Sequence, residues 1–298
     1  MAKTVYFKKV AVIGVGLIGG SIALVLRKKG LAGGITGIGR GIENLKTAKR
    51  LGIIDSFTLD IAEGVAGADL VIVAVPALKI ADTVKKALPH LRPPCIITDV
   101  GSVKSAVVEA IEPLLPEGVA FVPGHPIAGT ENSGADAAFM TLFKGRLCIL
   151  TPARNTDKDA LKAVRAVWKA AGSRVVSMDA ETHDRVLAAV SHLPHMIAYT
   201  LVNAVAESAG GVKDILGYSA GGFKDFTRIA SSSPEMWTDI CAMNRDNIVG
   251  MIAAFEKRLE ALKKMIVAGD LAGIRNAFER GKALRDAIAH KGAVAVKK

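Results

Sequence analysis

Short apolar runs alternate with longer amphipathic segments from Phe7 to about Val176. The runs are continuous in apolar residues and rich in Val and Ile, which is typical of parallel strands buried on both faces. The expected strands are Val10–Ile13, Ile35–Ile38, Leu70–Val75, Cys95–Thr98, Val119–Val122, Leu147–Leu150 and Arg174–Val176. The expected helices between them are Ile18–Lys29, Ile42–Leu51, Leu78–Leu88, Val103–Leu115 and Asp157–Ala171. Strands and helices that alternate at this spacing predict βαβ units and an α/β fold with a doubly wound parallel sheet.

The periodicity changes after about Met178, where apolar residues recur at three- and four-residue spacing without strand-like runs, as in amphipathic helices. The expected helices are Val186–Ala209, Trp237–Ala268 and Leu271–Ala289. The serines before Pro234 predict a helix start, with a Ser N-cap and Pro at the first helical position. The Gly-rich stretch Gly210–Gly222 predicts a loop or a broken helix. We therefore predict an α/β domain, residues 1–178, and an all-α domain, residues 179–298.

Composition limits the class of protein. Half of the 298 residues are hydrophobic and 22% are charged, which excludes a disordered chain and a disulfide-stapled miniprotein. The three cysteines, Cys95, Cys148 and Cys241, lie far apart, so they form neither a disulfide framework nor a zinc site by themselves. No segment typical of a signal peptide precedes the first strand, and no apolar run is long enough to span a bilayer. We therefore expect a cytoplasmic protein with no membrane span.

The 39 Lys and Arg residues exceed the 28 Asp and Glu residues, which gives a net charge of +11. Such a surplus suits nucleic acid, an anionic membrane surface or anionic small molecules. Aromatic residues make up only 5% of the chain and no docking motif for DNA or RNA is present, which argues against nucleic acid. Residues 256–298 hold eleven basic and five acidic residues interspersed on helical segments, as on a solvated face. An anionic small molecule is the partner that the charge favours.

A GxGxxG motif, Gly14-Val-Gly16-Leu-Ile-Gly19, lies between the first strand and the first helix. In such motifs the first glycine allows a tight turn, the second lets the backbone approach a pyrophosphate, and the third lets helix and strand pack closely. The pyrophosphate binds to free N–H groups at the helix N-terminus. The motif and the alternating elements together predict a Rossmann domain that binds NAD or NADP. The predicted cofactor-binding residues are Gly14, Gly16, Leu17, Ile18, Gly19, Arg40, Val75 and Pro76.

The end of the second strand bears on the choice between these cofactors. NAD sites usually place Asp or Glu there to accept hydrogen bonds from the adenosine ribose. Here the strand ends at Gly39 and is followed by Arg40, while the nearest acid, Glu43, falls in the next helix. We therefore favour NADP, with Arg40 as the partner of its 2′-phosphate. The alternative is that Arg40 is a solvated turn residue.

Two segments follow strands at the carboxyl edge of the predicted sheet, where doubly wound folds bind ligands. The first, from Thr98 to Lys104, would bring Ser102 and Lys104 near the nicotinamide, unless Ser102 only caps the next helix. The second, Gly124–Glu131, holds His125 in a loop. A neutral imidazole there can accept a proton from a substrate hydroxyl as hydride leaves the same carbon.

The helical part contains Ser-His192-Leu-Pro-His195, and further on Arg228 and Trp237. His192 and His195 share a helix face, but neither an HExxH pattern nor a carboxylate ligand accompanies them, so we predict no metal site. Arg228 stands in an otherwise apolar stretch. It is a candidate for binding a substrate carboxylate, because a guanidinium group can form two parallel hydrogen bonds to one.

Together these segments resemble the prephenate/arogenate dehydrogenase family of tyrosine biosynthesis. The resemblance extends over about residues 8–290 and rests on the phrases VGLIGGS, DVGSVK, GHPIAGTENSG, SHLPH and GGFKDFTRIA with MW following. It implies an N-terminal Rossmann domain and a C-terminal helical dimerisation domain, hence a homodimer. The sequence departs from the family at Gly39, where many members carry an acidic residue, so their cofactor preference does not transfer.

The resemblance also implies roles for single residues. His125 would be the catalytic histidine bonded to the ring hydroxyl of the substrate, Ser102 would orient it, and Arg228 would bind a substrate carboxylate. The other substrate-binding positions that it implies are His192, His195, Trp237, Thr130 and Glu131.

The implied reaction is the oxidative decarboxylation of a cyclohexadienol with two carboxylates, in which hydride transfer to NAD(P) and loss of CO2 produce an aromatic ring. The sequence leaves open whether the substrate is prephenate or arogenate. A β-hydroxyacid dehydrogenase or imine reductase shares the domain plan, but would usually rely on a lysine of the helical domain, and neither Lys213 nor Lys224 fits a matching pattern. A nicotinamide-binding regulator without catalytic activity is the other alternative.

Overall fold

The computed structural model describes residues 6–130, 132–208 and 215–296, with only the backbone described in residues 289–296. Contacts between residues group the chain into two compact units, Met1–Arg245 and Asp246–Lys298. The domain boundary expected at residues 178 and 179 falls inside the first unit and stays a prediction.

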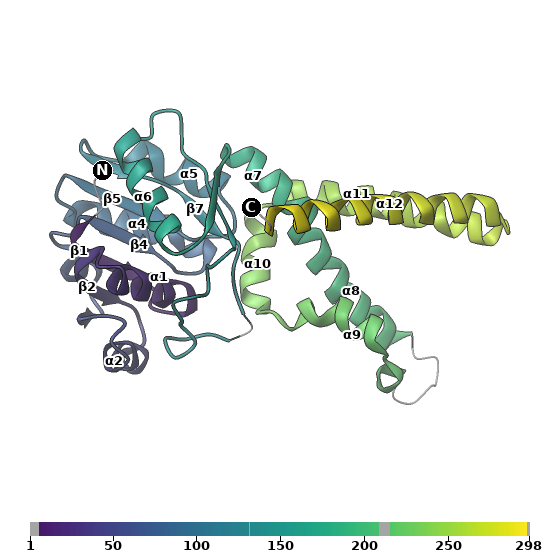
Figure 1. The fold of residues 1–298 in the computed structure, drawn as a ribbon, viewed down its shortest axis with the longest axis horizontal. Helices are drawn as coiled ribbons and strands as arrows, with labels where there is room; N and C mark the ends of the chain where they lie inside the picture. The colour runs from purple at the N-terminus through teal and green to yellow at the C-terminus, as the bar shows by residue number, and fades with distance from the viewer. Residues whose placement is uncertain (1–5, 131, 209–214, 297–298) are drawn as a thin grey trace. The chain divides into compact units, whose positions relative to one another are not determined.

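Six parallel strands form the main sheet of the first unit (Figure 1). They are β1 (Phe7–Ile13), β2 (Ala32–Ile38), β3 (Ser56–Thr58), β4 (Leu70–Val73), β5 (Cys95–Asp99) and β6 (Val119–Phe121). Their order is β3-β2-β1-β4-β5-β6, and every pairing is parallel. The strand order reverses between β1 and β4, and sheets of this kind bind ligands beyond the carboxyl ends of the strands at that point. The Rossmann-type fold is therefore confirmed; β3 was not predicted, because three residues are too few to show a period.

Helices pack on this sheet from both faces, because alternate residues of a strand point to opposite sides. Val10 and Val12 belong to one buried cluster, and Ala11 and Ile13 to another. The helices are α1 (Leu17–Lys28), α2 (Ile42–Arg50), α3 (Ile61–Val65), α4 (Ile80–Ala87), α5 (Ser105–Ile111) and α6 (Lys158–Ala170). The α-helical parts of α4 and α5 are shorter than expected.

The shortening has a local cause. The 3-10 turns η1 (Ala77–Lys79), η2 (Leu88–His90) and η3 (Glu112–Leu114) take up the ends of the two expected helices. A proline lies in the first turn of both η2 and η3, at Pro89 and Pro113. Proline lacks the N–H that would extend an α-helical hydrogen-bond ladder, so each helix ends before it.

A second sheet of three strands stands apart from the main one. It contains β7 (Gly124–Pro126), β8 (Leu147–Leu150) and β9 (Arg174–Ser177), with β7 antiparallel and β9 parallel to β8. The expectation that His125 lies in a loop is therefore wrong, because it pairs with Ile149 in this sheet. Gly124 and Pro126 disfavour strands in general, so the pattern gave no sign of β7.

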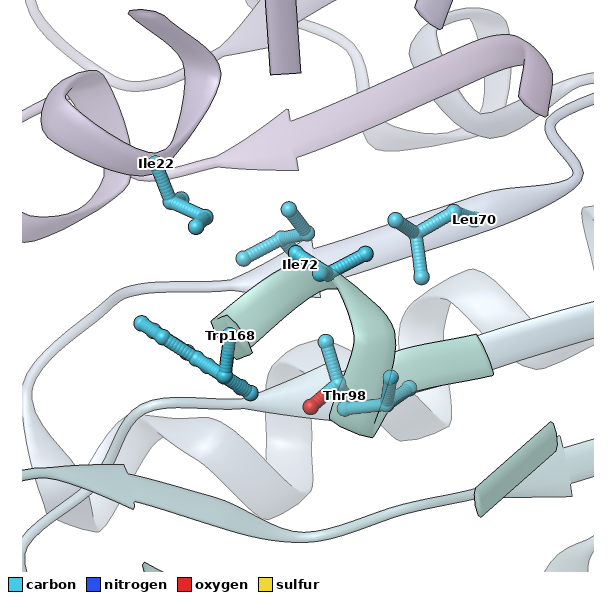
Figure 2. Close-up of a pocket in the computed structure, with 7 residues that line it drawn as sticks. Ile22, Leu70, Ile72, Thr98 and Trp168 are labelled. Carbon is cyan, nitrogen blue, oxygen red and sulfur yellow. The ribbon is translucent and has the colours of Figure 1, made fainter. Parts of the chain in front are cut away.

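The core between the main sheet, α1 and α6 contains a small cavity of about 10 Å³ (Figure 2). Its lining is Ile22, Leu70, Ile72, Thr98, Val164, Val167 and Trp168. Thr98 Oγ1 and Trp168 Nε1 are buried and have no hydrogen-bond partner among the described residues. The cavity is at most the size of one water molecule, so it belongs to the core and is no substrate site.

The helical part of the first unit begins at Asp179, whose carboxylate caps α7 by accepting a hydrogen bond from the Thr182 N–H. Its elements are α7 (Ala180–Leu187), the π-helical turn η4 (Ala188–His192), α8 (Leu193–Glu207), η5 (Ile215–Tyr218), α9 (Gly221–Thr227), η6 (Arg228–Ser231) and α10 (Pro234–Met243). Ser233 caps α10 and Pro234 opens it, as predicted. Of the Gly-rich stretch, residues 210–214 lie outside the described residues and the rest forms η5 and the start of α9.

The single helix expected over residues 237–268 is instead two, because Asn244 leaves helical geometry between α10 and α11. The second unit contains α11 (Arg245–Val267), apart from its first residue, and α12 (Leu271–Val296). Gly269 joins them at a φ of 66°, a left-handed conformation that favours glycine after a helix. None of the described helices is both long and apolar enough to cross a membrane.

Candidate active site

The glycine motif forms the turn between β1 and α1. Gly14 has a φ of 95°, and a Cβ added there would clash with the carbonyl group of Ala74. A Cβ on Gly19 would clash with the Gly14 carbonyl group, whereas a Cβ on Gly16 would meet nothing within 4 Å. Gly14 and Gly19 thus permit close packing of strand and helix, and Gly16 leaves open space at the helix N-terminus.

The N-terminus of α1 suits a phosphate group. Gly16 is its N-cap and offers no side-chain hydrogen bond, and the first turn holds no acidic residue. The N–H groups of Leu17 and Ile18 precede the first intrahelical hydrogen bond, from the Gly20 N–H to the Gly16 carbonyl at 2.7 Å. Free N–H groups and the positive end of the helix dipole favour an anion.

The residues predicted to hold the rest of a dinucleotide lie at the ends of two strands. Val75 and Pro76 follow β4, where Val75 is half-buried next to Gly14 and Pro76 is exposed. Arg40 is exposed just after β2.

No carboxylate takes the ribose position at the end of β2 in the described chain. The nearest acid, Glu43, pairs instead with Lys46 at 2.8 Å on the exposed face of α2. Asn44 on the same helix donates a hydrogen bond to the Val15 carbonyl and accepts one from the Ala135 N–H, both at 2.8 Å. Asn44 was not predicted as a site residue. Its side chain joins the glycine turn to the segment after β7.

Asp99, the last residue of β5, and Lys104 form a fully buried ion pair. The Lys104 ammonium group also donates to the Gly124 carbonyl at 2.9 Å, and Asp99 accepts from the N–H groups of Gly101 at 2.8 Å and Gly124 at 3.3 Å. The sequence predicts Lys104 near the nicotinamide, and in the structure its ammonium group is buried with its charge neutralised by Asp99. The pair fixes the backbone next to His125.

His125 is 8% exposed, and its Nδ1 lies 2.9 Å from Nε2 of His183. His183 Nδ1 lies 2.7 Å from Asp184 Oδ1. Burial lowers the pKa of His125 well below its ordinary value, and the positive charges that His183, Lys104 and His192 can carry lower it further. His125 is therefore a neutral imidazole at neutral pH, which is the form that can accept a proton.

Ser102 is half-buried in the segment between β5 and α5. The alternative that Ser102 merely caps this helix is not supported, because α5 begins at Ser105 and no side chain caps it. Thr130 is exposed after β7, and its Oγ1 accepts a hydrogen bond from the Asn132 N–H at 3.3 Å. Glu131 lies outside the described residues.

The SHLPH segment places its two histidines against Trp237. The ring of His195 stacks on Trp237, with centroids 3.8 Å apart at 27°, and that of His192 meets it edge-on at 5.9 Å. Burial lowers the pKa of His192 to about 4 and lowers that of His195 as well. Trp237 Nε1 is buried without a hydrogen-bond partner among the described residues. Within those residues, no three His, Cys, Asp or Glu side chains are grouped to hold a metal ion.

Arg228 and Asp239 follow this segment in the helical part, and Asp239 bonds it to the part of the chain after β4. Arg228 begins η6 with an exposed side chain, and its charge contributes to the lowered pKa of His195. Asp239 on α10 is buried, and its Oδ2 accepts a hydrogen bond from the Leu78 N–H at 3.2 Å, two residues after Pro76. The helical part is thereby bonded to the loop after β4.

Sequence reasoning missed five polar residues next to the predicted ones, namely the half-buried Asn44 and the buried His183, Asp184, Asp239 and Asn244. They belong to no recognised motif: Asn44, His183, Asp184 and Asp239 lie on helices, and Asn244 lies at the turn between α10 and α11. The one available signal was the adjacent His-Asp pair, since two ionisable residues on a helix that must pack against a sheet need partners.

Two family models match this chain. The one described as "Prephenate dehydrogenase, nucleotide-binding domain" matches residues 22–177, which start after the glycine motif. The one described as "Prephenate dehydrogenase, dimerization domain" matches residues 179–280.

Individual relatives agree with these matches. A prephenate dehydrogenase of Bacillus subtilis is 36% identical over 94% of this chain and 76% of its own length. A cyclohexadienyl dehydrogenase of Zymomonas mobilis is also 36% identical, over 95% of this chain and 96% of its own. The crystal structure of A. aeolicus prephenate dehydrogenase in complex with hydroxyphenyl propionate and NAD+ is 39% identical, with a TM-score of 0.90, over 96% of this chain and 100% of that one. Because both family models and these relatives match across the sheet and the helical part alike, the chain belongs to the prephenate dehydrogenase family.

Proposed function

We propose that this protein oxidises and decarboxylates prephenate, or its amino analogue arogenate, with a nicotinamide cofactor, as a step of tyrosine biosynthesis. The observation that carries the proposal is His125, a buried neutral imidazole that uses Nδ1 for His183 and so leaves Nε2 for a substrate. A base of this kind suits a substrate whose hydroxyl proton departs as hydride leaves the same carbon. The relatives named as prephenate and cyclohexadienyl dehydrogenases support the substrate class.

We propose that this chain's side chains contribute mainly position and charge. His125 accepts the hydroxyl proton, and Arg228 binds a substrate carboxylate. When the ring carboxylate leaves as CO2, its electron pair stays in the ring and makes it aromatic, so the reaction runs in one direction. His195 and Trp237 supply a flat, half-apolar wall against which a six-membered ring can pack.

The glycine turn fits a dinucleotide, since its open space at Gly16 adjoins the free N–H groups of Leu17 and Ile18. When bound, the nicotinamide supplies the hydride acceptor. We propose NADP as the preferred form. Gly39 brings no carboxylate to repel a 2′-phosphate, and the exposed Arg40 guanidinium can pair with one.

The proposed role of His125 is tested by steady-state kinetics of a His125→Asn variant with prephenate. Loss of the base should lower kcat about 10²–10⁴-fold and change the cofactor KM little. His90→Asn is the matched control, because His90 is exposed in η2. Near-full turnover by His125→Asn would refute the assignment, and equal losses in both variants would point to misfolding.

We propose that the protein is a homodimer. Residues 179–280 match a dimerisation-domain model, and the second unit exposes large apolar side chains. These are Phe255, Leu259, Ile266, Leu271, Phe278, Leu284 and Ile288. Light scattering should give twice the chain's mass of 31.1 kDa; a monomeric mass at micromolar concentration would contradict this.

The cytoplasm is the proposed site of action, and the three cysteines Cys95, Cys148 and Cys241 are free, as is usual in a reducing compartment. A regulator that binds the cofactor without turnover is the competing function. Reduction of the nicotinamide on addition of prephenate would exclude it.

A further inference from the structure

Five buried residues form a continuous hydrogen-bonded chain behind the proposed site, in which every link joins two side chains except that from Asn244 to the Asp184 backbone carbonyl. In order they are His125, His183, Asp184, Asn244 and His192, each no more than 8% exposed. His125 and His192, at its two ends, are the residues expected to meet the substrate. The family resemblance assigns no role to His183, Asp184 or Asn244, which lie between them.

Asp184 sets the proton on His183. Burial raises the pKa of Asp184, but hydrogen bonds from His183 and from the N–H groups of Ser105 and Lys104 outweigh this and lower it. The carboxylate is therefore ionised and can only accept hydrogen bonds. His183 Nδ1, 2.7 Å from Asp184 Oδ1, must carry the hydrogen that it donates.

His183 in turn determines which nitrogen of His125 carries the proton. With one proton on each imidazole, His183 Nε2 is left as an acceptor. His125 Nδ1 lies 2.9 Å from that atom, so it must be the donor. His125 then holds its proton at Nδ1, and its Nε2 carries a lone pair.

Asn244 holds His192 in the tautomer opposite to that of His125. The Asp184 carbonyl oxygen, 2.8 Å from the Asn244 amide, can only accept, so the amide nitrogen faces it. That nitrogen also lies 3.1 Å from His192 Nδ1. An amide NH2 only donates, so His192 Nδ1 is an acceptor and its proton is on Nε2.

We infer that Asp184, through His183 on one side and Asn244 on the other, holds His125 and His192 in opposite tautomers. His125 presents an Nε2 lone pair to the substrate and His192 presents an Nε2–H donor. His183, Asp184 and Asn244 are positioning residues, since they act only through the two histidines. The inference rests on the proposed function for its catalytic meaning, but the tautomers are a property of the protein without substrate.

The arrangement has a chemical consequence for each histidine. When His125 Nε2 accepts the hydroxyl proton, the His125 ring becomes positively charged while its Nδ1–H remains hydrogen-bonded to His183. The Asp184 carboxylate, which is hydrogen-bonded to His183, stabilises this positive charge. His192 has a pKa of about 4 because of burial, so it stays neutral and can donate a hydrogen bond to a substrate oxygen without adding charge.

Long-range 1H–15N NMR spectra of the 15N-labelled, substrate-free protein distinguish the two tautomers of an imidazole. The chain has only six histidines, so single His→Gln variants assign the signals. We expect Nδ1–H with bare Nε2 for His125 and the reverse for His192. An Nε2–H tautomer at His125, as a doubly protonated His183 would impose, or an Nδ1–H tautomer at His192, overturns the inference.

Kinetics with prephenate tests whether the hydrogen-bonded chain from Asp184 through His183 to His125 (the relay) contributes to catalysis. His183→Leu should lower kcat about 10- to 100-fold, as is typical of residues that orient a catalytic group, with the cofactor KM unchanged. His183→Gln should restore most of kcat, because a Gln amide oxygen can take the place of Nε2 and accept from His125. His90→Leu is the control at an exposed histidine.

The outcomes separate the two claims. If the NMR spectra show the expected tautomers but wild-type protein does not oxidise prephenate, the proposed function fails and the tautomer assignment stands. If wild-type protein is active and His183→Leu matches His90→Leu in kcat, the relay is refuted. Equal losses in His183→Leu and His183→Gln would likewise refute it, since the hydrogen-bond acceptor would then be irrelevant.

Discussion

Replacing Lys104 with methionine removes the cation from the buried pair with Asp99 while keeping most of the side-chain volume. Both side chains are fully buried. In the variant, Asp99 keeps hydrogen bonds only from the Gly101 and Gly124 N–H groups, and the Gly124 carbonyl loses the partner that it has at 2.9 Å. Breaking a buried pair from one side costs about 3–5 kcal/mol, because an uncompensated charge stays in the interior. That is a large share of the roughly 5–15 kcal/mol by which domains are stable.

Urea unfolding followed by circular dichroism measures this cost. The chain offers a matched control in Lys162→Met, since Lys162 pairs with Asp159 at 2.9 Å but both side chains are exposed; exposed pairs contribute little. The double variant Lys104→Met/Asp99→Asn removes both charges and should recover much of the lost stability. If Lys104→Met shifts the urea midpoint no further than Lys162→Met, the argument about the buried pair is wrong.

Three other predictions follow from the site. Arg40→Ala should lower kcat/KM for NADP relative to NAD about tenfold, the loss of roughly 1.5 kcal/mol for one hydrogen bond to a charged group; an unchanged ratio would favour a solvated turn residue. Arg228→Ala should raise the prephenate KM while kcat falls less, in initial-rate measurements. The folded-state pKa of His192, about 4, lies below the ordinary value of about 6.5, so the unfolded chain binds this proton first. The free energy of unfolding should therefore fall between about pH 6.5 and pH 4, on the order of 3 kcal/mol, and His192→Asn should flatten that slope.

Much of the fold could be predicted from local pattern. The strand β4 and the second half of β1 are continuous apolar runs buried on both faces, and the apolar residues of β2 and β5 still mark strands. The glycine motif marks the turn between β1 and α1. The second sheet could not be predicted in this way. Strand β7 contains a glycine and a proline, and it forms because β8, whose paired residues lie 22 to 26 positions further on, offers it hydrogen bonds.

The candidate site likewise contains some residues that sequence motifs predict and others that only the fold brings together. Recognisable sequence motifs contain the predicted residues His125, His192, His195 and Trp237. In the structure, the rings of His192 and His195 both contact Trp237. Lys104 was predicted near the nicotinamide from its position after β5, but its buried pairing with Asp99 in the same segment was not predicted. Apart from the adjacent His183 and Asp184, the network behind His125 joins residues 52 to 60 positions apart, so no local pattern contains it.

The most direct test of the proposed function is an assay of the purified wild-type protein with prephenate and with arogenate, each with NAD+ and with NADP+. The reduced nicotinamide, the CO2 and the aromatic product should form in equal amounts, faster with NADP+ than with NAD+. Absence of nicotinamide reduction in all four combinations, from folded protein that binds the cofactor, would contradict the proposed function.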